Sequence, residues 1–169
     1  INMLKRLLTV ICVITILIIL GIFINKFFPA DFPDVPGMGE IDPDASKEFI
    51  TTESGIQYRI LRKGNDIKPV RTDEVNITQK QWLADGHVLE NDFEDNTDSG
   101  YRVSTSTLPG MREIVQYIGE GGLIEGIFPP SMAFGKRGHK LAKTKNNANL
   151  YCLIQLNNVY KGFFNKFPG

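Results

Sequence analysis

Residues 108–122 read Leu108-Pro-Gly-Met-Arg-Glu-Ile-Val-Gln-Tyr-Ile-Gly-Glu-Gly-Gly122 and contain the one clear helix pattern outside the N-terminus. Pro109 suits a first helical turn, and the glycines that follow Ile118 end the helix. Four apolar residues recur at i, i+3, i+4 and i+7 and form one stripe: Met111, Ile114, Val115 and Ile118. A short helix with a single apolar face predicts packing against a sheet.

Segments with strand-like alternation lie on both sides of this helix. Residues 74–83 run into the turn dipeptide Asp85-Gly86, which favours a hairpin. Further strands are expected at residues 56–60, 101–105, 123–128 and 150–156. The sequence therefore predicts an α+β fold in which an antiparallel sheet wraps around one short helix.

The overall charge argues against several kinds of partner. The chain has 169 residues, with 19 basic and 19 acidic side chains. A balanced charge gives no footprint for nucleic acid, so none is expected as a partner. Only two histidines are present, far apart, and the acidic segment 92–100 lacks the glycine at the sixth position and the closing glutamate of a calcium loop. We expect no metal and no cofactor.

The N-terminus has the pattern of a membrane anchor. Leu7 to Ile24 is an uncharged run that would span about 27 Å as a helix. A cleaved signal peptide is the alternative, but its apolar run is normally about 7–15 residues and ends at a small-residue site, which is absent. Lys5 and Arg6 precede the run, which places the N-terminus in the cytoplasm and the rest outside.

Residues 27–50 are predicted to be an acidic, proline-rich tether. They contain four prolines and show no apolar period of 2 or 3.6. The predicted organisation is thus an anchor at 1–26, the tether at 27–50, a folded domain at 51–161 and a tail at 162–169. Cys12 lies in the apolar run and Cys152 in the domain, so no disulfide is expected.

Seven short motifs in the domain resemble one family in order and spacing. They are Thr52-Glu-Ser-Gly-Ile-Gln-Tyr58, Leu83-x-Asp-Gly86, Leu108-Pro-Gly-Met111, Glu120-Gly-Gly122, Phe128-Pro-Pro130, Met132-Ala-Phe-Gly135 and Asn147-Ala-x-Leu150. Together they resemble the FKBP-type peptidyl-prolyl cis-trans isomerase domain over residues 51–161. The Pro-Gly-Met-Arg-Glu and Phe-Pro-Pro-Ser stretches and Cys152 are similar to membrane-anchored FKBPs of the Bacteroidetes envelope, including those associated with gliding motility.

The resemblance implies an FKBP-like sheet with a shallow apolar pocket that receives proline. Isomerisation of an X–Pro bond crosses a resonance barrier of roughly 18–20 kcal/mol and needs no nucleophile. A site that strips water from the amide and favours its twisted form lowers this barrier.

The resemblance also assigns roles to individual residues. The catalytic positions are Leu89, Glu90, Leu108 through its backbone N–H, Met111 as the pocket floor, and Phe134. The substrate-binding positions are Ile77, Gln79, His139 and Cys152. Aromatic residues of the family are replaced at Gln79, Leu89, Met111 and Cys152, and Phe134 lacks a hydroxyl, so a wider, softer and less polar pocket with reduced turnover is expected. Without the resemblance, Met111 and Cys152 would be assigned to the core, and Glu90 and His139 to solvated surface.

These inferences lead to a predicted function. We expect a monomeric, single-pass peptidyl-prolyl isomerase on the periplasmic side of a bacterial inner membrane, acting in protein folding on proline-containing segments or unfolded envelope proteins. One alternative is a catalytically impaired chaperone or assembly factor of the same fold. Another is a structural envelope protein with a vestigial pocket.

Overall fold

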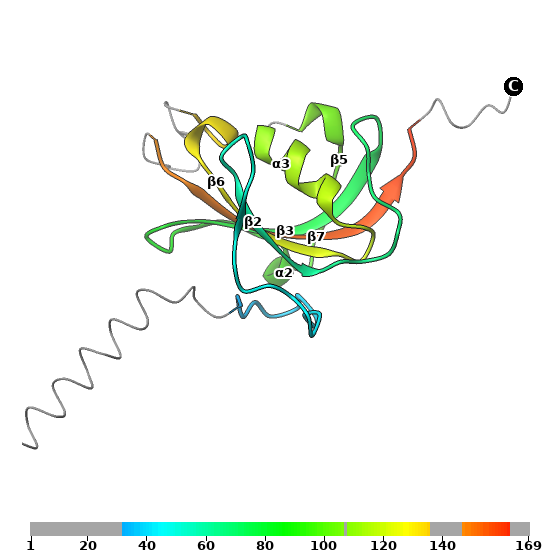
Figure 1. The fold of residues 1–169 in the computed structure, drawn as a ribbon, viewed down its shortest axis with the longest axis horizontal. Coiled ribbons are helices and arrows are strands. Elements are labelled where there is room, and N and C mark those ends of the chain that lie inside the picture. The colour runs from blue at the N-terminus through cyan, green and yellow to red at the C-terminus, as the bar shows by residue number, and fades with distance from the viewer. Residues whose placement is uncertain (1–31, 107, 136–146, 163–169) are drawn as a thin grey trace, which may run out of the picture. The chain divides into compact units, whose positions relative to one another are not determined.

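The computed structural model describes residues 32–106, 108–135 and 147–162, and its strands form one antiparallel sheet (Figure 1). The strands lie in the order β1-β2-β6-β7-β3-β4, and β5 also pairs with β3. Their bounds are β1 Ile50–Thr51, β2 Gln57–Arg62, β3 Glu74–Leu83, β4 Val88–Asn91, β5 Ser99–Arg102, β6 Leu123–Phe128 and β7 Leu150–Tyr160. The antiparallel sheet predicted from the alternation is confirmed.

The predicted helix is α3, Pro109–Ile114, which continues as a 3-10 turn, Val115–Tyr117. It lies against one face of the sheet (Figure 1). A one-turn helix, α2, spans Asp92–Asp95 in the acidic segment after β4, and two more 3-10 turns span Val103–Thr105 and Pro130–Met132. The strand predicted to reach residue 105 ends at Arg102, because the N–H groups of Val103 and Ser104 bond to the carbonyls of Asp73 and Arg71 instead.

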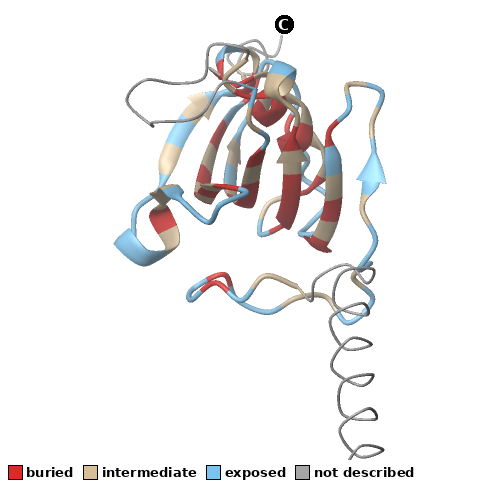
Figure 2. Cartoon of the chain, turned by 90° about the vertical axis from the view of Figure 1, so that its left-hand side faces the viewer, coloured by how far each residue is buried: buried red, intermediate tan, exposed pale blue. Residues whose placement is uncertain are grey.

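The face of the sheet beneath α3 carries the main core, where the buried residues of Figure 2 concentrate. Ile114 of the helix is fully buried, as are Phe128 and Ile154 of the sheet. Two glycines let helix and sheet approach closely. A Cβ at Gly110 would lie 2.5 Å from the Phe128 ring, and one at Gly126 would lie 2.5 Å from Ile114 Cδ1. Helix α3 therefore rests directly on β6.

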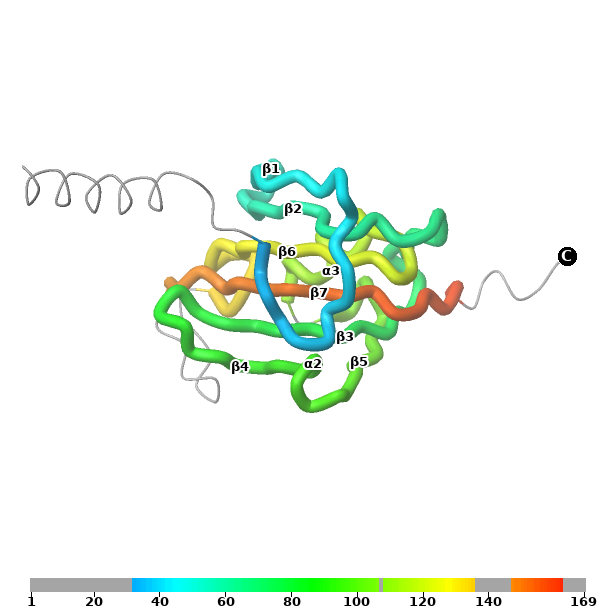
Figure 3. The backbone as a smooth tube through the Cα atoms, turned by 90° about the horizontal axis from the view of Figure 1, so that it is seen from below, coloured from blue at the N-terminus to red at the C-terminus, as the bar shows by residue number. Residues whose placement is uncertain are grey.

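The opposite, outer face of the sheet is also covered. Leu61, Leu123 and Leu153 alternate with residues of the main core and so point away from α3. All three are nevertheless fully buried. The cover is the segment 34–49, here called the strap, which crosses this face in a U-shaped path (Figure 3). The strap contributes its own buried apolar side chains, Val35 and Met38.

Two arginines of β2 fasten the strap. Arg62 donates hydrogen bonds to the carbonyls of Met38 and Glu40 at 3.2 and 2.7 Å, and also to Gln155 Oε1 of β7 at 2.9 Å. Arg59 donates to the Lys47 carbonyl at 2.9 Å and lies 4.7 Å from the centroid of the Phe49 ring.

Between residues 34 and 49, the prediction of an extended tether is wrong. Although the segment is acidic and rich in proline, two of its apolar side chains, Val35 and Met38, are buried. Its backbone carbonyls also accept hydrogen bonds from arginines of β2. Residues 27–31 of the predicted tether lie outside the described residues.

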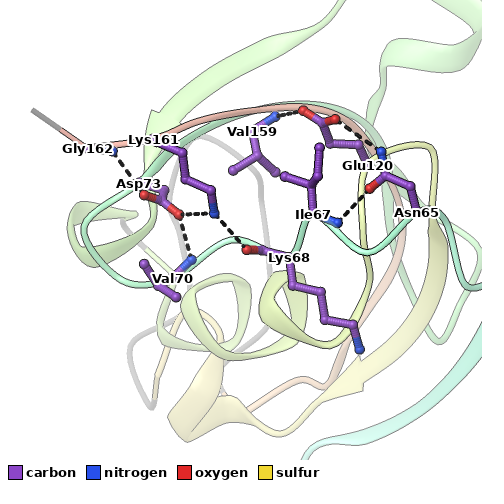
Figure 4. Close-up of polar contacts among 9 residues, drawn as sticks. All are labelled: Asn65, Ile67, Lys68, Val70, Asp73, Glu120, Val159, Lys161 and Gly162. Atoms are coloured by element: carbon purple, nitrogen blue, oxygen red, sulfur yellow. Dashed lines mark hydrogen bonds and ion pairs between the residues drawn. The ribbon is translucent and has the colours of Figure 1, made fainter. Parts of the chain in front are cut away.

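The loop 64–73 is locked to the end of β7 on the helix side (Figure 4). The Asp73 carboxylate accepts hydrogen bonds from the N–H groups of Val70 and Gly162, both at 2.9 Å, and pairs with Lys161 at 3.1 Å. Glu120 accepts from the Val159 N–H at 2.7 Å. Lys68 Nζ donates to the Tyr117 carbonyl at the end of the helix at 2.9 Å. These contacts join loop, helix end and β7 into one unit.

The predicted anchor and most of the predicted tail cannot be compared with the fold. Residues 1–26 and 163–169 lie outside the described residues. Within residues 32–106, 108–135 and 147–162, no helix has both the length and the apolar character needed to cross a membrane.

Candidate functional site

A pocket of about 530 Å³ lies on the helix side of the sheet. Strands β3, β4 and β5 line one side, and the entry to α3 and the segment after Pro130–Met132 line the other. Its described lining consists of Gln79, Gln81, Leu89, Glu90, Ser99, Gly100, Tyr101, Thr105, Ser106, Leu108, Met111 and Phe134.

Six of the nine residues assigned from the sequence meet in this pocket: Gln79, Leu89, Glu90, Leu108, Met111 and Phe134. Ile77 and Cys152 do not line it. Both are fully buried in the main core, so neither presents surface to a ligand and their assignment to substrate binding is corrected. Burial also raises the pKa of the Cys152 thiol well above its usual value, which keeps it protonated. His139 lies outside the described residues.

The apolar part of the pocket is built at the start of α3. Leu108 is the N-cap residue in an extended conformation, and its carbonyl accepts from the Met111 N–H at 3.1 Å. Its own N–H has no acceptor among the described residues. Met111 follows in the first turn with 3% of its surface exposed. The helix start thus places a backbone donor beside an apolar floor.

The opposite wall is polar. Gln81 Nε2 donates to Gln79 Oε1 at 2.8 Å, and Gln79 Nε2 donates to Glu90 Oε2 at 2.9 Å. Burial and the nearby Asp92 charge raise the pKa of Glu90, and the Gln79 hydrogen bond opposes this shift. This wall is more polar than the pocket predicted from the sequence, and no sequence pattern indicated this chain of hydrogen bonds.

Several residues that line the pocket were not predicted from the sequence. Gln81 could have been found, because it is two residues from Gln79 on one strand and shares its face. Tyr101 was assigned to a strand but not to the site. Its hydroxyl is buried with no hydrogen-bond partner among the described residues, and burial raises its pKa further above the usual value. Ser99, Thr105 and Ser106 were not predicted, since isolated hydroxyl side chains are common in strands and loops alike and do not by themselves mark a binding site.

The arrangement suits binding and distortion of an amide. The described part of the chain holds no group of three His, Cys, Asp or Glu side chains placed to bind a metal. The pocket instead combines an apolar floor, a free backbone donor and one carboxylate. Residues 65–157, more than half of the chain, match the family model of the FKBP-type peptidyl-prolyl cis-trans isomerase. The chain belongs to this family.

Bacterial relatives support the assignment. The chain is 30% identical over 103 residues to the FKBP-type 22 kDa peptidyl-prolyl cis-trans isomerase of Escherichia coli K12, covering 60% of this chain and 50% of the relative. It is 30% identical over 89 residues to the outer membrane protein MIP of Legionella longbeachae, covering 53% and 38%. The chain therefore spans half or less of these relatives.

A solved FKBP structure confirms the FKBP-like fold. The crystal structure of FkpA from Escherichia coli matches with a TM-score of 0.63 and 27% identity, covering 68% of this chain and 53% of FkpA. The residues that match the family model, 65–157, lie within the region 51–161 where the seven motifs were found.

Proposed function

We propose that the chain is a peptidyl-prolyl cis-trans isomerase that acts on proline-containing segments of proteins in the bacterial envelope. Family membership supports the reaction class. The observation that carries the proposal is the pairing, in one pocket, of the Met111 floor with the free N–H of Leu108.

The geometry suggests how the pocket lowers the rotation barrier. A proline ring covers Met111 beside Leu89 and Phe134, which removes water from the prolyl amide. A peptide carbonyl accepts the Leu108 N–H, a hydrogen bond with a net value of about 0.5–1.5 kcal/mol. Because the twisted amide loses resonance and becomes less polar, an apolar environment stabilises it relative to the planar ground state. No covalent intermediate is needed.

The thinned lining predicts reduced turnover. Met111 adapts to different ligand shapes but lacks the flat face of an aromatic ring. The double substitution Met111→Trp and Leu89→Phe is expected to raise kcat/KM. The larger side chains should also lower the free energy of unfolding by about 1–3 kcal/mol, because they overpack the core. Turnover of the unaltered chain equal to that of a fully aromatic relative would show that the lining does not limit the rate.

The decisive test measures binding and isomerisation of the same blocked Leu-Pro peptide by the full chain in detergent. We expect exchange between cis and trans peptide signals, and amide-shift changes at Leu108, Met111 and Phe134. Met111→Asp should abolish both by placing a charge on the apolar floor. Equal binding of a peptide with Ala in place of Pro would contradict the proposal, and binding without turnover would point to the chaperone or assembly factor instead.

We further propose that the domain lies outside the cytoplasm, held by residues 1–26. The uncharged run Leu7 to Ile24 after Lys5 and Arg6 supports this orientation. One relative is named an outer membrane protein. Protease added to spheroplasts should remove the domain, and its protection there would contradict the proposed topology.

A further inference from the structure

The carboxylate of Glu90 gives the pocket a charge that has no role in the proposed binding of proline to the apolar floor. Among the described lining residues, Glu90 alone is charged. Its carboxylate is held in place by Gln79, which is itself held by Gln81. This wall is therefore organised before a ligand arrives, so little side-chain entropy is lost when the carboxylate is used.

A second carboxylate lies behind the first. Asp92 is 6% exposed and accepts hydrogen bonds from the Gln79 N–H at 3.3 Å and from Thr97 Oγ1 at 3.2 Å. Between residues 90 and 98 the chain has five acidic residues and no basic one. The negative charge around the pocket wall therefore extends beyond Glu90.

No cation in the described structure compensates this charge. The ion pairs between described residues join Arg59 with Glu125, Lys63 with Asp44, Arg102 with Glu74 and Lys161 with Asp73. Within the described ranges, neither Glu90 nor Asp92 has a basic partner. A partly buried carboxylate without a cation favours a ligand that brings one, because the lower local dielectric strengthens the attraction.

We propose that the pocket selects prolyl segments that carry a lysine or arginine next to the proline, with Glu90 as the specificity-determining residue. This inference rests on the proposed prolyl function. The apolar floor and the Leu108 N–H hold the proline, and the Glu90 carboxylate pairs with the neighbouring basic side chain. Gln79 and Gln81 act as positioning residues that fix the carboxylate.

The test uses the full chain in detergent and three blocked peptides, Ala-Xaa-Pro-Phe-Ala, in which Xaa is Lys, norleucine or Glu. Norleucine matches the lysine stem without its charge. We expect the Lys peptide to bind about three- to tenfold tighter than the Glu peptide, in keeping with a partly exposed ion pair. The norleucine peptide should bind with intermediate affinity. Raising the salt concentration should bring the affinities for the Lys and Glu peptides closer together.

Two variants and one control identify the residue responsible. Glu90→Gln keeps an acceptor for Gln79 but removes the charge, so the Lys/Glu ratio should fall to about one. Glu90→Lys should reverse the preference, which a variant that merely unfolded could not do. Asp98→Asn removes an exposed charge from the same acidic segment, outside the described pocket lining, and should keep most of the preference.

The outcomes separate this inference from the proposed function. Equal binding of the Lys and Glu peptides, or a ratio that survives Glu90→Gln, would overturn the specificity but leave the isomerase proposal intact. A ratio lost equally in Asp98→Asn would also overturn it, since the general field of the loop would then be responsible. Binding that persists when Ala replaces Pro in the norleucine peptide would count against the isomerase function itself.

Discussion

The two faces of the sheet are closed in different ways. On the helix side, α3 packs on β6 through Gly110 and Gly126, over a core of buried apolar residues. On the outer side, the strap has no regular secondary structure and is held by arginine hydrogen bonds over a few buried leucines. The helix side carries the pocket, so the difference suggests that one face serves ligand binding while the other serves stability alone.

Deletion of the strap is the most severe way to test this separation. Removing residues 34–49 from the full chain would expose Leu61, Leu123 and Leu153, each of which contributes about 1.5–3 kcal/mol when buried. Allowing for a compact unfolded state, we expect a loss of about 4–6 kcal/mol in the free energy of unfolding. Urea denaturation followed by tryptophan fluorescence measures it. An unchanged midpoint would mean that the strap is a tether after all.

The next largest effect is expected at the ion pair beneath the strap. Arg59 Nε and Glu125 Oε2 are 2.7 Å apart, and both side chains are nearly inaccessible to solvent. Glu125→Ala would remove the carboxylate that pairs with the buried Arg59 guanidinium, which should cost about 3 kcal/mol. The exposed pair of Arg102 and Glu74, 3.3 Å apart, supplies the control, and Glu74→Ala should cost less than about 1 kcal/mol. Similar losses for both variants would show that the strap does not seal the outer face.

One buried methionine on each face allows the two faces to be compared directly. Met38 of the strap is 9% exposed and Met111 of the pocket is 3% exposed. Replacing either by alanine should lower the free energy of unfolding by about 2–3 kcal/mol, since both leave a cavity. Prolyl-peptide affinity should fall only in Met111→Ala. Loss of affinity in Met38→Ala, measured on a sample shown to be folded, would indicate that the two faces are coupled.

The helix-side face was largely predictable from sequence, and the outer face was not. Helical and alternating patterns located α3, β3 and β6 because burial on one face leaves a periodic trace. The strap leaves no such trace. Its two buried apolar residues, Val35 and Met38, are three apart among prolines and glycines, and the acceptors that hold it are backbone carbonyls, which every residue has.

The site shows a similar limit. The motifs predicted Leu108 and Met111 as pocket residues, and both line the pocket because the helix start fixes their positions. They also placed Ile77 and Cys152 there, although both side chains are fully buried. Whether the side chain of a predicted wall residue reaches the pocket or stays buried in the core depends on three-dimensional packing. The hydrogen bond between Gln79 and Glu90 likewise depends on the pairing of β3 with β4.

The smallest predicted effect is on the pH dependence of stability. The carboxyl groups of the two faces have pKa shifts of opposite sign. On the helix side, burial raises the pKa of Asp73, but hydrogen bonds from Val70 and Gly162 and the charge of Lys161 outweigh it and lower the pKa below the ordinary 3.8. On the outer side, burial outweighs the attraction of Arg59 and raises the pKa of Glu125 above the ordinary 4.5.

A lowered pKa means that the unfolded state binds the proton more readily. Asp73 therefore stabilises the fold above about pH 4, and this contribution is lost as the pH falls through its folded value. Glu125 behaves in the opposite way, since its raised pKa favours the fold below about pH 4.5 and the contribution is lost as the pH rises through the folded value.

Asp73→Asn should cost about 1–2 kcal/mol at pH 7 and progressively less below pH 4. Glu125→Gln should instead make the free energy of unfolding fall less steeply than in the unaltered chain as the pH rises above 4.5. Urea titrations between pH 2.5 and 7 measure both slopes, with Asp66→Asn as an exposed control in the Asp73 loop. If both substitutions changed the slope of unfolding free energy against pH in the same direction, relative to the unaltered chain, the two carboxylates would have the same kind of environment, contrary to the structure.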